Sequence, residues 1–296
     1  MFRPMFALSA LGAFAALPPA PPAAAQTAPA PAAPAPIEAD WHDIPDSEIL
    51  VITLSGGRQV FVRLAPRYAP GHVANIRRLA AEGWWDGTAI YRAQDNYVAQ
   101  WGDPTDAKPL PPLVIENPPA EYEWPQYDGV AGMSRPDPYA PRTGFSADGW
   151  PLGTDGKASW LTHCYGMVGV ARDNPPSTGS GAALYAVIGH APRHLDRNIA
   201  LVGRVIQGID LLSTLPRGRE ALGLYSTAAE QTPILSVRLA SQLPEDERPR
   251  FQYRATDNPR FAAFIAAREN RAEAFFVRPA GGADICNVDP GVRRLR

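Results

Sequence analysis

The chain has 296 residues, of which 28 are basic and 30 are acidic, so its formal net charge is −2. A balance this close to neutral excludes the strongly basic surface that a nucleic acid or an anionic membrane would select. About 270 residues remain after the N-terminal segment. That length can bury a sizeable core and fits one large domain with additions.

The first 25 residues predict a secretory signal peptide and no part of the fold. Arg3 gives a short positive start, Met5–Leu17 is apolar, and Ala23-Ala24-Ala25 offers a small-residue cleavage site. The apolar run is shorter than the roughly 20 residues that a membrane span needs, and no other stretch is long enough. We therefore expect an exported, periplasmic chain.

Residues 26–40 follow the cleavage site and predict an extended linker, because Gln26–Pro36 is rich in Ala and Pro. Cleavage removes Arg3 and no acidic residue, which lowers the net charge of −2 by one, to −3. We expect no nucleic acid and no membrane span among the contacts of the mature chain. The sequence leaves the oligomeric state open.

The first structured elements are a hairpin and a helix. Glu48–Leu54 and Gln59–Leu64 alternate on either side of Ser55-Gly56-Gly57, which predicts two strands joined by a glycine-rich turn. A helix is expected from Pro70 to about Glu82, where Gly83 ends it. Its apolar stripe consists of Val73, Ile76 and Ala80.

The stretch from Trp85 to Thr105 predicts two antiparallel strands. Turn residues at Asp86-Gly87 and Asp95-Asn96 bound runs of period two. Arg92 and Gln100 are polar residues inside these runs. From spacing alone, they indicate a strand with one face in water.

The same stretch resembles the signature of the cyclophilin-type peptidyl-prolyl isomerases: an aromatic-His-Arg strand, a Phe-Met-x-Gln strand, then Gly-Gly-Asp. Arg92 falls on the catalytic arginine of that family, and Gln100 on its active-site glutamine. Tyr97 and Val98 fall where Phe and Met form the pocket for the proline ring. The resemblance implies peptidyl-prolyl isomerase activity on proline-containing polypeptides, with no cofactor and no metal.

The resemblance covers roughly Ile49 to Leu243. Further elements that carry it are Thr162–Ala171, the loop Asn174–Ser180, Leu195-Asp196 and Leu201–Val205. Ala182–Ile188 and Ile234–Ala240 predict strands, and Gln207–Leu215 predicts a short helix. The implied fold is mainly β: a closed antiparallel barrel with two capping helices, over residues 41–243, followed by a helical extension over residues 244–296.

The expected pocket departs from the family pattern. The expected lining residues include Ala171, Ala183, His194 and Leu195. Ala183 stands where the family has a Phe, and His194 where it has a Trp. Ile199 and Tyr91 each take the place of a His, and Trp101 that of a Gly. These changes imply a wider, less aromatic pocket, with lower activity or with a replacement aromatic from the insertion.

The chemistry needs few groups. Rotation about an Xaa–Pro bond breaks amide resonance, so the prolyl nitrogen gains a lone pair in the twisted state. A fixed donor to that nitrogen stabilises the transition state more than the ground state. Arg92 is the candidate donor because its guanidinium is permanently charged and rigid. Gln100 would orient the peptide carbonyl or Arg92 itself.

Two segments have no counterpart in the resemblance. Residues 106–161 are irregular but hold Trp124, Trp150 and Trp160, which favours an ordered insertion over a floppy loop, and we expect it to cover one barrel end. Asn258–Phe276 has apolar residues at helical spacing, which predicts a helix against the barrel or, alternatively, a partner-binding helix.

Cys164 and Cys286 are an even pair in an exported chain. That context favours a disulfide over two buried thiols, although sequence alone gives no distance between them.

Other functions compete with the isomerase. A non-catalytic peptide-binding or chaperone module on the same barrel would agree with the changed pocket. A structural subunit would use the insertion and the C-terminal helix. A zinc site at His190 and His194 is disfavoured by Pro192 between them, and Ser180 lacks the frame of a hydrolase elbow.

Overall fold

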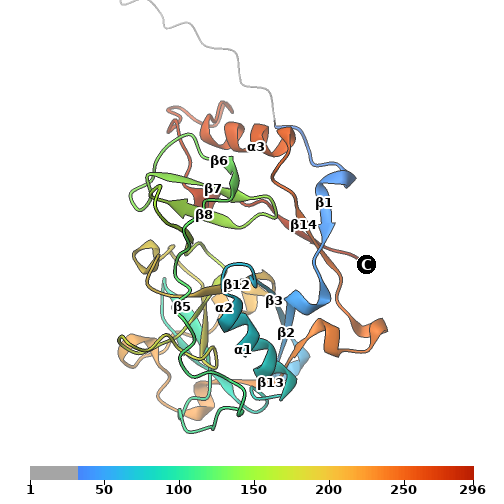
Figure 1. The fold of residues 1–296 in the computed structure, drawn as a ribbon, viewed down its shortest axis with the longest axis vertical. Coiled ribbons are helices and arrows are strands. Elements are labelled where there is room, and N and C mark those ends of the chain that lie inside the picture. Colours follow the sequence, from blue (N-terminus) through green and yellow to red (C-terminus); the bar gives the residue numbers. More distant parts are fainter. Residues whose placement is uncertain (1–32) are drawn as a thin grey trace, which may run out of the picture.

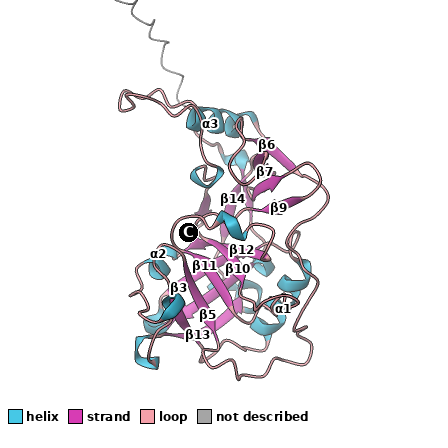
Figure 2. Ribbon diagram, turned by 90° about the vertical axis from the view of Figure 1, so that its left-hand side faces the viewer, coloured by secondary structure: helices cyan, strands magenta, loops and turns pink. Residues whose placement is uncertain are grey.

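The computed structural model describes residues 33–296, so the predicted signal peptide and most of the linker lie outside the described residues. Eight antiparallel strands close into a barrel, which confirms the expected mainly β fold (Figures 1 and 2). The barrel strands are β2 (Ile49–Leu54), β3 (Gln59–Leu64), β4 (Ala89–Ala93), β5 (Val98–Gly102), β10 (Met167–Val170), β11 (Leu184–Val187), β12 (Leu201–Gln207) and β13 (Thr232–Leu239). They neighbour one another in the order β10-β11-β5-β4-β13-β2-β3-β12.

The first barrel strand shows why the chain folds this way. Successive side chains of a strand point to opposite faces. Leu50, Ile52 and Leu54 of β2 are buried in the barrel interior. Ile49 and Val51 point outward into a second apolar cluster with residues of the C-terminal extension. Strand β2 is apolar almost throughout because both of its faces are covered.

Two helices accompany the barrel, as expected. Helix α1 (Pro70–Ala81) begins with proline in its first turn, and Gly83 follows it with φ of 61°. Its buried face, which includes Val73 and Ile76, packs into the barrel core. Helix α2 (Ile209–Ser213) buries Leu212 in the same core.

The insertion has two parts. Its first part packs Leu110, Val114 and Tyr122 against the barrel core. Its second part is a sheet of its own, formed by β6 (Gly129–Gly132), β7 (Arg142–Ser146), β8 (Pro151–Thr154) and β9 (Ser159–Leu161). Trp150 and Trp160 are only 4% and 1% exposed. The tryptophans therefore serve as core residues of an ordered segment.

The C-terminal helix differs from the prediction. Helix α3 spans Pro259–Glu269 and lies on the β6–β9 sheet, away from the barrel (Figure 1). Phe261 packs edge-on against Phe145 of β7, with ring centroids 5.5 Å apart. The expected continuation to residue 276 was wrong. The chain leaves the helix at Asn270, and Phe275 is 86% exposed.

The two ends of the described chain meet in a third sheet, which the sequence did not predict. Its strands are β1 (Trp41–Asp43), β14 (Phe251–Arg254) and β15 (Val292–Arg294), in the order β1-β14-β15. Asp40, just before β1, is buried and forms an ion pair with Arg260 of α3. The division of the chain after residue 243 remains a prediction, since β1 pairs across it.

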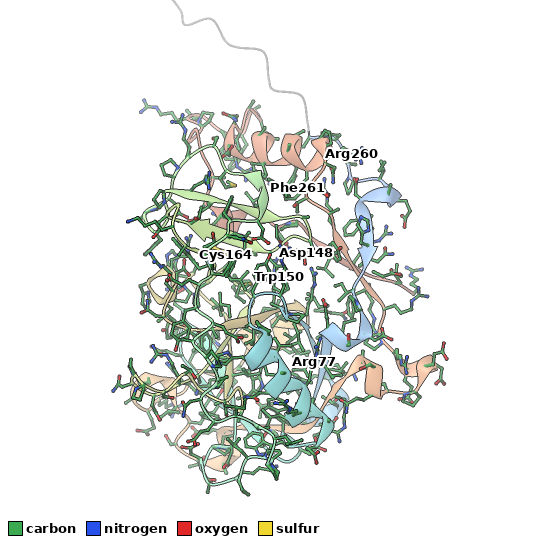
Figure 3. All side chains as sticks on the ribbon, in the orientation of Figure 1. Arg77, Asp148, Trp150, Cys164, Arg260 and Phe261 are labelled. Carbon is green, nitrogen blue, oxygen red and sulfur yellow. A yellow bond between two sulfur atoms is a disulfide. The ribbon has the colours of Figure 1, made fainter. Side chains whose placement is uncertain are left out.

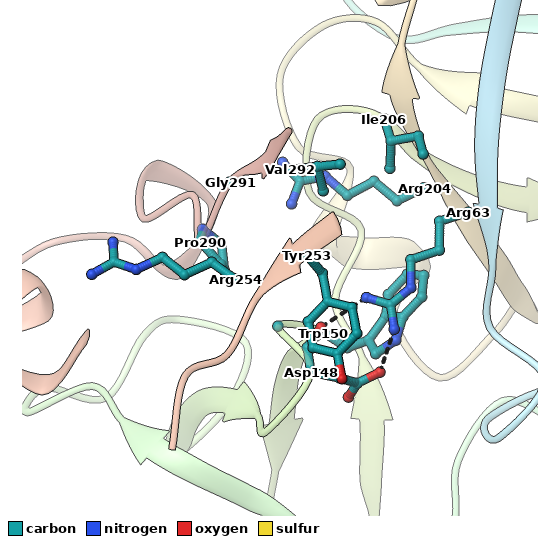
Figure 4. Close-up of a pocket in the computed structure, with 11 residues that line it drawn as sticks. Arg63, Asp148, Trp150, Arg204, Ile206, Tyr253, Arg254, Pro290, Gly291 and Val292 are labelled. Atoms are coloured by element: carbon teal, nitrogen blue, oxygen red, sulfur yellow. Dashed lines mark hydrogen bonds and ion pairs between the residues drawn. The ribbon is translucent and has the colours of Figure 1, made fainter. Parts of the chain in front are cut away.

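An arginine joins the barrel to the other two sheets (Figure 4). The guanidinium of Arg63 in β3 lies 4.9 Å from the ring centroid of Trp150 and 4.4 Å from that of Tyr253. It donates to the Asp148 carboxylate at 2.6 Å. The cavity here measures about 20 Å³, room for one water at most, so this junction is structural.

The predicted disulfide is confirmed. Cys164 and Cys286 are bonded, with their Cα atoms 4.9 Å apart. Cys164 lies where the barrel meets the β6–β9 sheet (Figure 3), and Cys286 belongs to the C-terminal extension. The bond therefore ties the extension to the rest of the chain.

Candidate active site

The two predicted catalytic residues lie opposite each other on neighbouring strands. Arg92 of β4 is paired with Gln100 of β5, and the register shifts between Ile90 and Arg92. Such a bulge lets consecutive side chains reach the same partner. Arg92 Nη1 donates to Gln100 Oε1 at 2.8 Å, and Gln100 Nε2 donates to the Tyr91 hydroxyl at 2.5 Å. Gln100 is thus oriented from both sides.

Two further acceptors hold the guanidinium. Arg92 Nη2 donates to Gln94 Oε1 at 2.5 Å, and Arg92 Nε donates to the Leu222 carbonyl at 2.6 Å. Leu222 belongs to the segment between α2 and β13, which is hydrogen-bonded to β4 through Gly218 and Tyr225. A guanidinium has five N–H groups. Within residues 33–296, two of those of Arg92 remain available for a ligand.

The charge of Arg92 survives its half-buried position. Burial lowers the pKa of its guanidinium, while the nearby Tyr97 and Tyr91 raise it. An arginine pKa starts so high that the group stays protonated. The guanidinium carbon lies 5.8 Å from the ring centroid of Tyr97. The site therefore offers a fixed positive donor beside an aromatic ring.

An apolar cluster lies beside this pair, and most of the predicted pocket residues are in it. Val98 is buried, while Tyr97, Ala171 and Leu195 are partly buried. His194 stacks on Tyr97, with ring centroids 6.3 Å apart and planes 9° apart. The structure thus brings these residues together. Their contact with a proline ring remains a prediction.

Ala183 lies elsewhere, on the wall of a groove of about 630 Å³. Tyr91 and Gln100 also line this groove, so it adjoins the candidate catalytic pair. The insertion and the loop before β11 supply its other walls. Their lining residues include Asp106, Lys108, Leu110, Glu116, Asn117, Arg172, Asp173, Ser177, Gly179 and Ser180.

The insertion holds the loop that forms one wall. Thr178 of this loop donates from its backbone N–H to Asn117 Oδ1 and from its hydroxyl to the Pro118 carbonyl. His72 of α1 lies between the two segments. Its Nδ1 is 2.6 Å from Glu121 Oε2, and its Nε2 is 3.3 Å from the Thr178 carbonyl. The groove is therefore bounded by a loop with fixed partners.

Three groups of the candidate site were not predicted from the sequence: Gln94, the Leu222 carbonyl and Tyr185. Gln94 shares the β4 run with Arg92, at the spacing of two that puts side chains on one face, so this signal was present. Tyr185 likewise follows Ala183 at a spacing of two. It is buried in the cluster that contains Tyr97 and Val98. The role of Leu222 could not be seen in the sequence, because the acceptor is its backbone carbonyl, which every residue has.

Comparison with known proteins agrees with this geometry. The family model described as cyclophilin type peptidyl-prolyl cis-trans isomerase/CLD matches residues 49–239. A probable peptidyl-prolyl cis-trans isomerase of Brucella suis is 28% identical over 176 residues, which are 60% of this chain and 76% of that protein. Peptidyl-prolyl cis-trans isomerase B of Bacillus subtilis is 41% identical over 51 residues, which are 17% of this chain and 36% of that protein.

Among solved structures, cyclophilin AquaCyp293 from Hirschia baltica has a similar fold, with a TM-score of 0.66 and 23% identity. The alignment covers 86% of this chain and 93% of that one. The matched family model spans the whole barrel, from β2 to β13, and includes Arg92 and Gln100. The chain therefore belongs to the cyclophilin-type peptidyl-prolyl cis-trans isomerase family.

Proposed function

We propose that this isomerase acts on Xaa–Pro bonds of exported proteins while they fold, with Arg92 as the hydrogen-bond donor to the prolyl nitrogen. The observation that carries the proposal is the Arg92–Gln100 pair, in which Arg92 lies beside Tyr97 of the apolar cluster and Gln100 lines the groove. The apolar cluster of Tyr97, Val98 and Leu195 would receive the proline ring. The chain on either side of the proline would lie along the groove.

The proposed mechanism needs no proton transfer. One of the two N–H groups of Arg92 that remain available would donate to the prolyl nitrogen as its lone pair develops in the twisted state. Gln94, Gln100 and the Leu222 carbonyl fix the guanidinium before the substrate binds. A donor fixed in advance needs little reorganisation in the transition state, which is the main source of electrostatic catalysis.

The groove supports a polypeptide as the ligand. Its volume of about 630 Å³ falls within the roughly 300–1,000 Å³ that is usual for ligand sites. Polar residues of the insertion and of the loop before β11 line it, which suits an extended chain with its own peptide groups to satisfy.

We expect the purified mature chain to accelerate the cis–trans exchange of a short Ala-Pro peptide. The exchange is measured by NMR line-shape or exchange spectroscopy, which needs no coupling protease. The same titration gives the dissociation constant of the peptide. A chain that binds the peptide without accelerating exchange would favour the alternative, a peptide-binding module on the same barrel.

Export is the second half of the proposal. It is supported by the signal-peptide pattern of residues 1–25 and by the disulfide, which is rare in reducing compartments. Within residues 33–296, no helix has the length and apolarity that a membrane span requires.

We expect the exported protein to begin near Gln26. Mass spectrometry of the chain recovered from a periplasmic fraction measures its N-terminus directly. A protein recovered there with Met1 or Arg3 still attached would contradict cleavage at this site. Substituting Ala23 and Ala25 by large charged residues provides a control, since it should block processing.

A further inference from the structure

We propose that Tyr185 is the aromatic floor of the slot that receives the proline ring, and that His163 and Asp196 hold it there. Tyr185 acts as a positioning residue beneath Tyr97, Val98 and Leu195. The inference deepens the proposed function and rests on it, because the ligand is the proline ring of a client chain.

Strand pairing puts Tyr185 at the centre of the site. Its cross-strand partner in β5 is Gln100, and its partner in β10 is Gly169. The neighbouring residues Leu184 and Ala186 point into the barrel core. By the alternation of a strand, Tyr185 points to the outer face, where it joins the apolar cluster.

The glycine opposite makes room for the ring. A Cβ atom at Gly169 would lie 2.4 Å from both Cζ and Oη of Tyr185, far inside van der Waals contact. The ring therefore lies across the backbone of β10, where only glycine leaves space for it. Ala183, two residues earlier and just before β11, lines the groove together with Gln100 and brings no ring to it. The aromatic ring that position 183 does not provide is thus supplied by Tyr185.

A chain of buried hydrogen bonds fixes the phenol end. The Tyr185 hydroxyl lies 3.0 Å from Nε2 of His163, and Nδ1 of His163 lies 2.9 Å from Oδ1 of Asp196. His163 is fully buried, and Asp196 also accepts from Arg193 Nε at 2.6 Å. A carboxylate only accepts hydrogen bonds, so a neutral His163 donates from Nδ1 to Asp196. Its Nε2 then accepts a hydrogen bond from the Tyr185 hydroxyl.

The environment keeps both groups neutral. Burial lowers the pKa of His163, against the opposing effect of Asp196. Burial also raises the pKa of Tyr185 well above its ordinary value. The hydroxyl therefore remains a donor near neutral pH, and the ring cannot rotate away without leaving His163 unpaired in the interior. Such an unpaired buried group is costly.

The Tyr185 ring also has apolar neighbours, which form the rest of the cluster. Tyr97, Ala171, Leu195 and Ile199 are partly buried and pack on the cluster formed by Tyr185, Val98 and Val187. Tyr185 itself is only 4% exposed. It therefore lies beneath the partly buried residues that would contact the proline ring and supports them from below.

The test compares three variants of the mature chain: Tyr185→Phe, Tyr185→Ala and the double variant Ala183→Phe/Tyr185→Ala. Each is titrated with an Ala-Ala-Pro-Phe peptide by NMR, and kcat and KM are measured separately. We expect Tyr185→Ala to raise the dissociation constant about tenfold, with kcat at saturation little changed. Tyr185→Phe keeps the ring and should bind within about threefold of the wild type.

The double variant moves an aromatic ring from position 185 to position 183, just before β11. We expect it to recover peptide binding relative to Tyr185→Ala, a result that a merely structural role would not produce. If Tyr185→Ala does not fold, Tyr185→Leu replaces it, because Leu keeps most of the buried volume. The Leu variant should still bind several-fold more weakly.

A folded Ala or Leu variant with the dissociation constant of the wild type overturns the inference, even if its melting temperature is lower. Failure of the proposed function has a different outcome. A wild-type chain that binds the peptide without isomerising it contradicts the catalysis, while the comparison of dissociation constants still decides the role of Tyr185.

Discussion

Replacing Arg92 by alanine should lower kcat/KM for an Xaa–Pro peptide by a factor of about 10² to 10³. The reason is that one fixed donor to charge developing in a transition state contributes roughly 2.7–4 kcal/mol. Arg92 is the group with N–H bonds still available next to Gln100. Exchange spectroscopy on the purified variant measures the loss.

The barrel should remain folded in this variant. Arg92 is half-buried and makes no ion pair among the described residues, and water can reach the acceptors that it leaves. Arg92→Lys should recover only part of the activity, because an ammonium lacks the planar fork that Gln94, Gln100 and Leu222 fix. Arg77→Ala is the matched control. It removes a guanidinium from the exposed side of α1, where Arg77 contacts the Ser47 carbonyl.

Two results would contradict the assignment. Full activity in a folded Arg92→Ala protein would mean that another group donates to the prolyl nitrogen. Unfolding of the variant, with Arg77→Ala still folded, would mean that Arg92 is mainly a structural residue of β4.

Loss of the disulfide should produce the largest change in stability. Cys164 and Cys286 are 122 residues apart, and cross-linking a loop of that length is nominally worth about 5 kcal/mol in the chain-entropy model. For a chain of this size, that corresponds to a fall in melting temperature of roughly 10 °C or more. We expect this fall in Cys164→Ala/Cys286→Ala, measured by calorimetry or circular dichroism.

A reducing agent distinguishes the stability that comes from the disulfide bond from the stability that comes from the packing of the two side chains. The sulfur atoms lie in the apolar cluster of the β6–β9 sheet and the extension, so alanine also removes packed volume. Reduced wild-type protein keeps the volume and loses only the bond, so it should show most of the same fall. Two free thiols titrated in denatured, unreduced protein would show that the bond does not form in solution.

Sequence pattern was sufficient for individual strands of the barrel, because they are amphipathic or wholly apolar at period two and their turns carry glycine, while closure into a barrel was implied by the family resemblance. The hairpin of Glu48–Leu54 and Gln59–Leu64 was predicted to within one residue of β2 and β3. The helix expected over Asn258–Phe276 was extended too far because Phe275 and Phe276 continue the apolar spacing. Spacing alone does not show whether another element packs against a side chain. Phe275 has no such partner among the described residues, because it is exposed.

The position of α3 could not be read from its sequence either. An amphipathic stripe shows that a helix packs on something but does not identify the partner. The partner here is a sheet built from the insertion, and that sheet also gives Trp150 to the junction with Arg63. Strand β1 could not be predicted either. Its three residues show no hydrophobic alternation, and they form a strand because they pair with β14.

The sequence by itself determined the strands, because alternation and turn residues are written along the chain. Its resemblance to the cyclophilin-type family implied the closed barrel and the roles of Arg92 and Gln100, and two cysteines in an exported chain favoured a disulfide. The tertiary structure decided the rest of the site. The Leu222 carbonyl, 130 residues away in the chain, helps to fix Arg92, and Gly169 of β10 makes room for Tyr185 of β11. Such contacts depend on the register of whole strands and on the shape of the packed barrel, which no local pattern encodes.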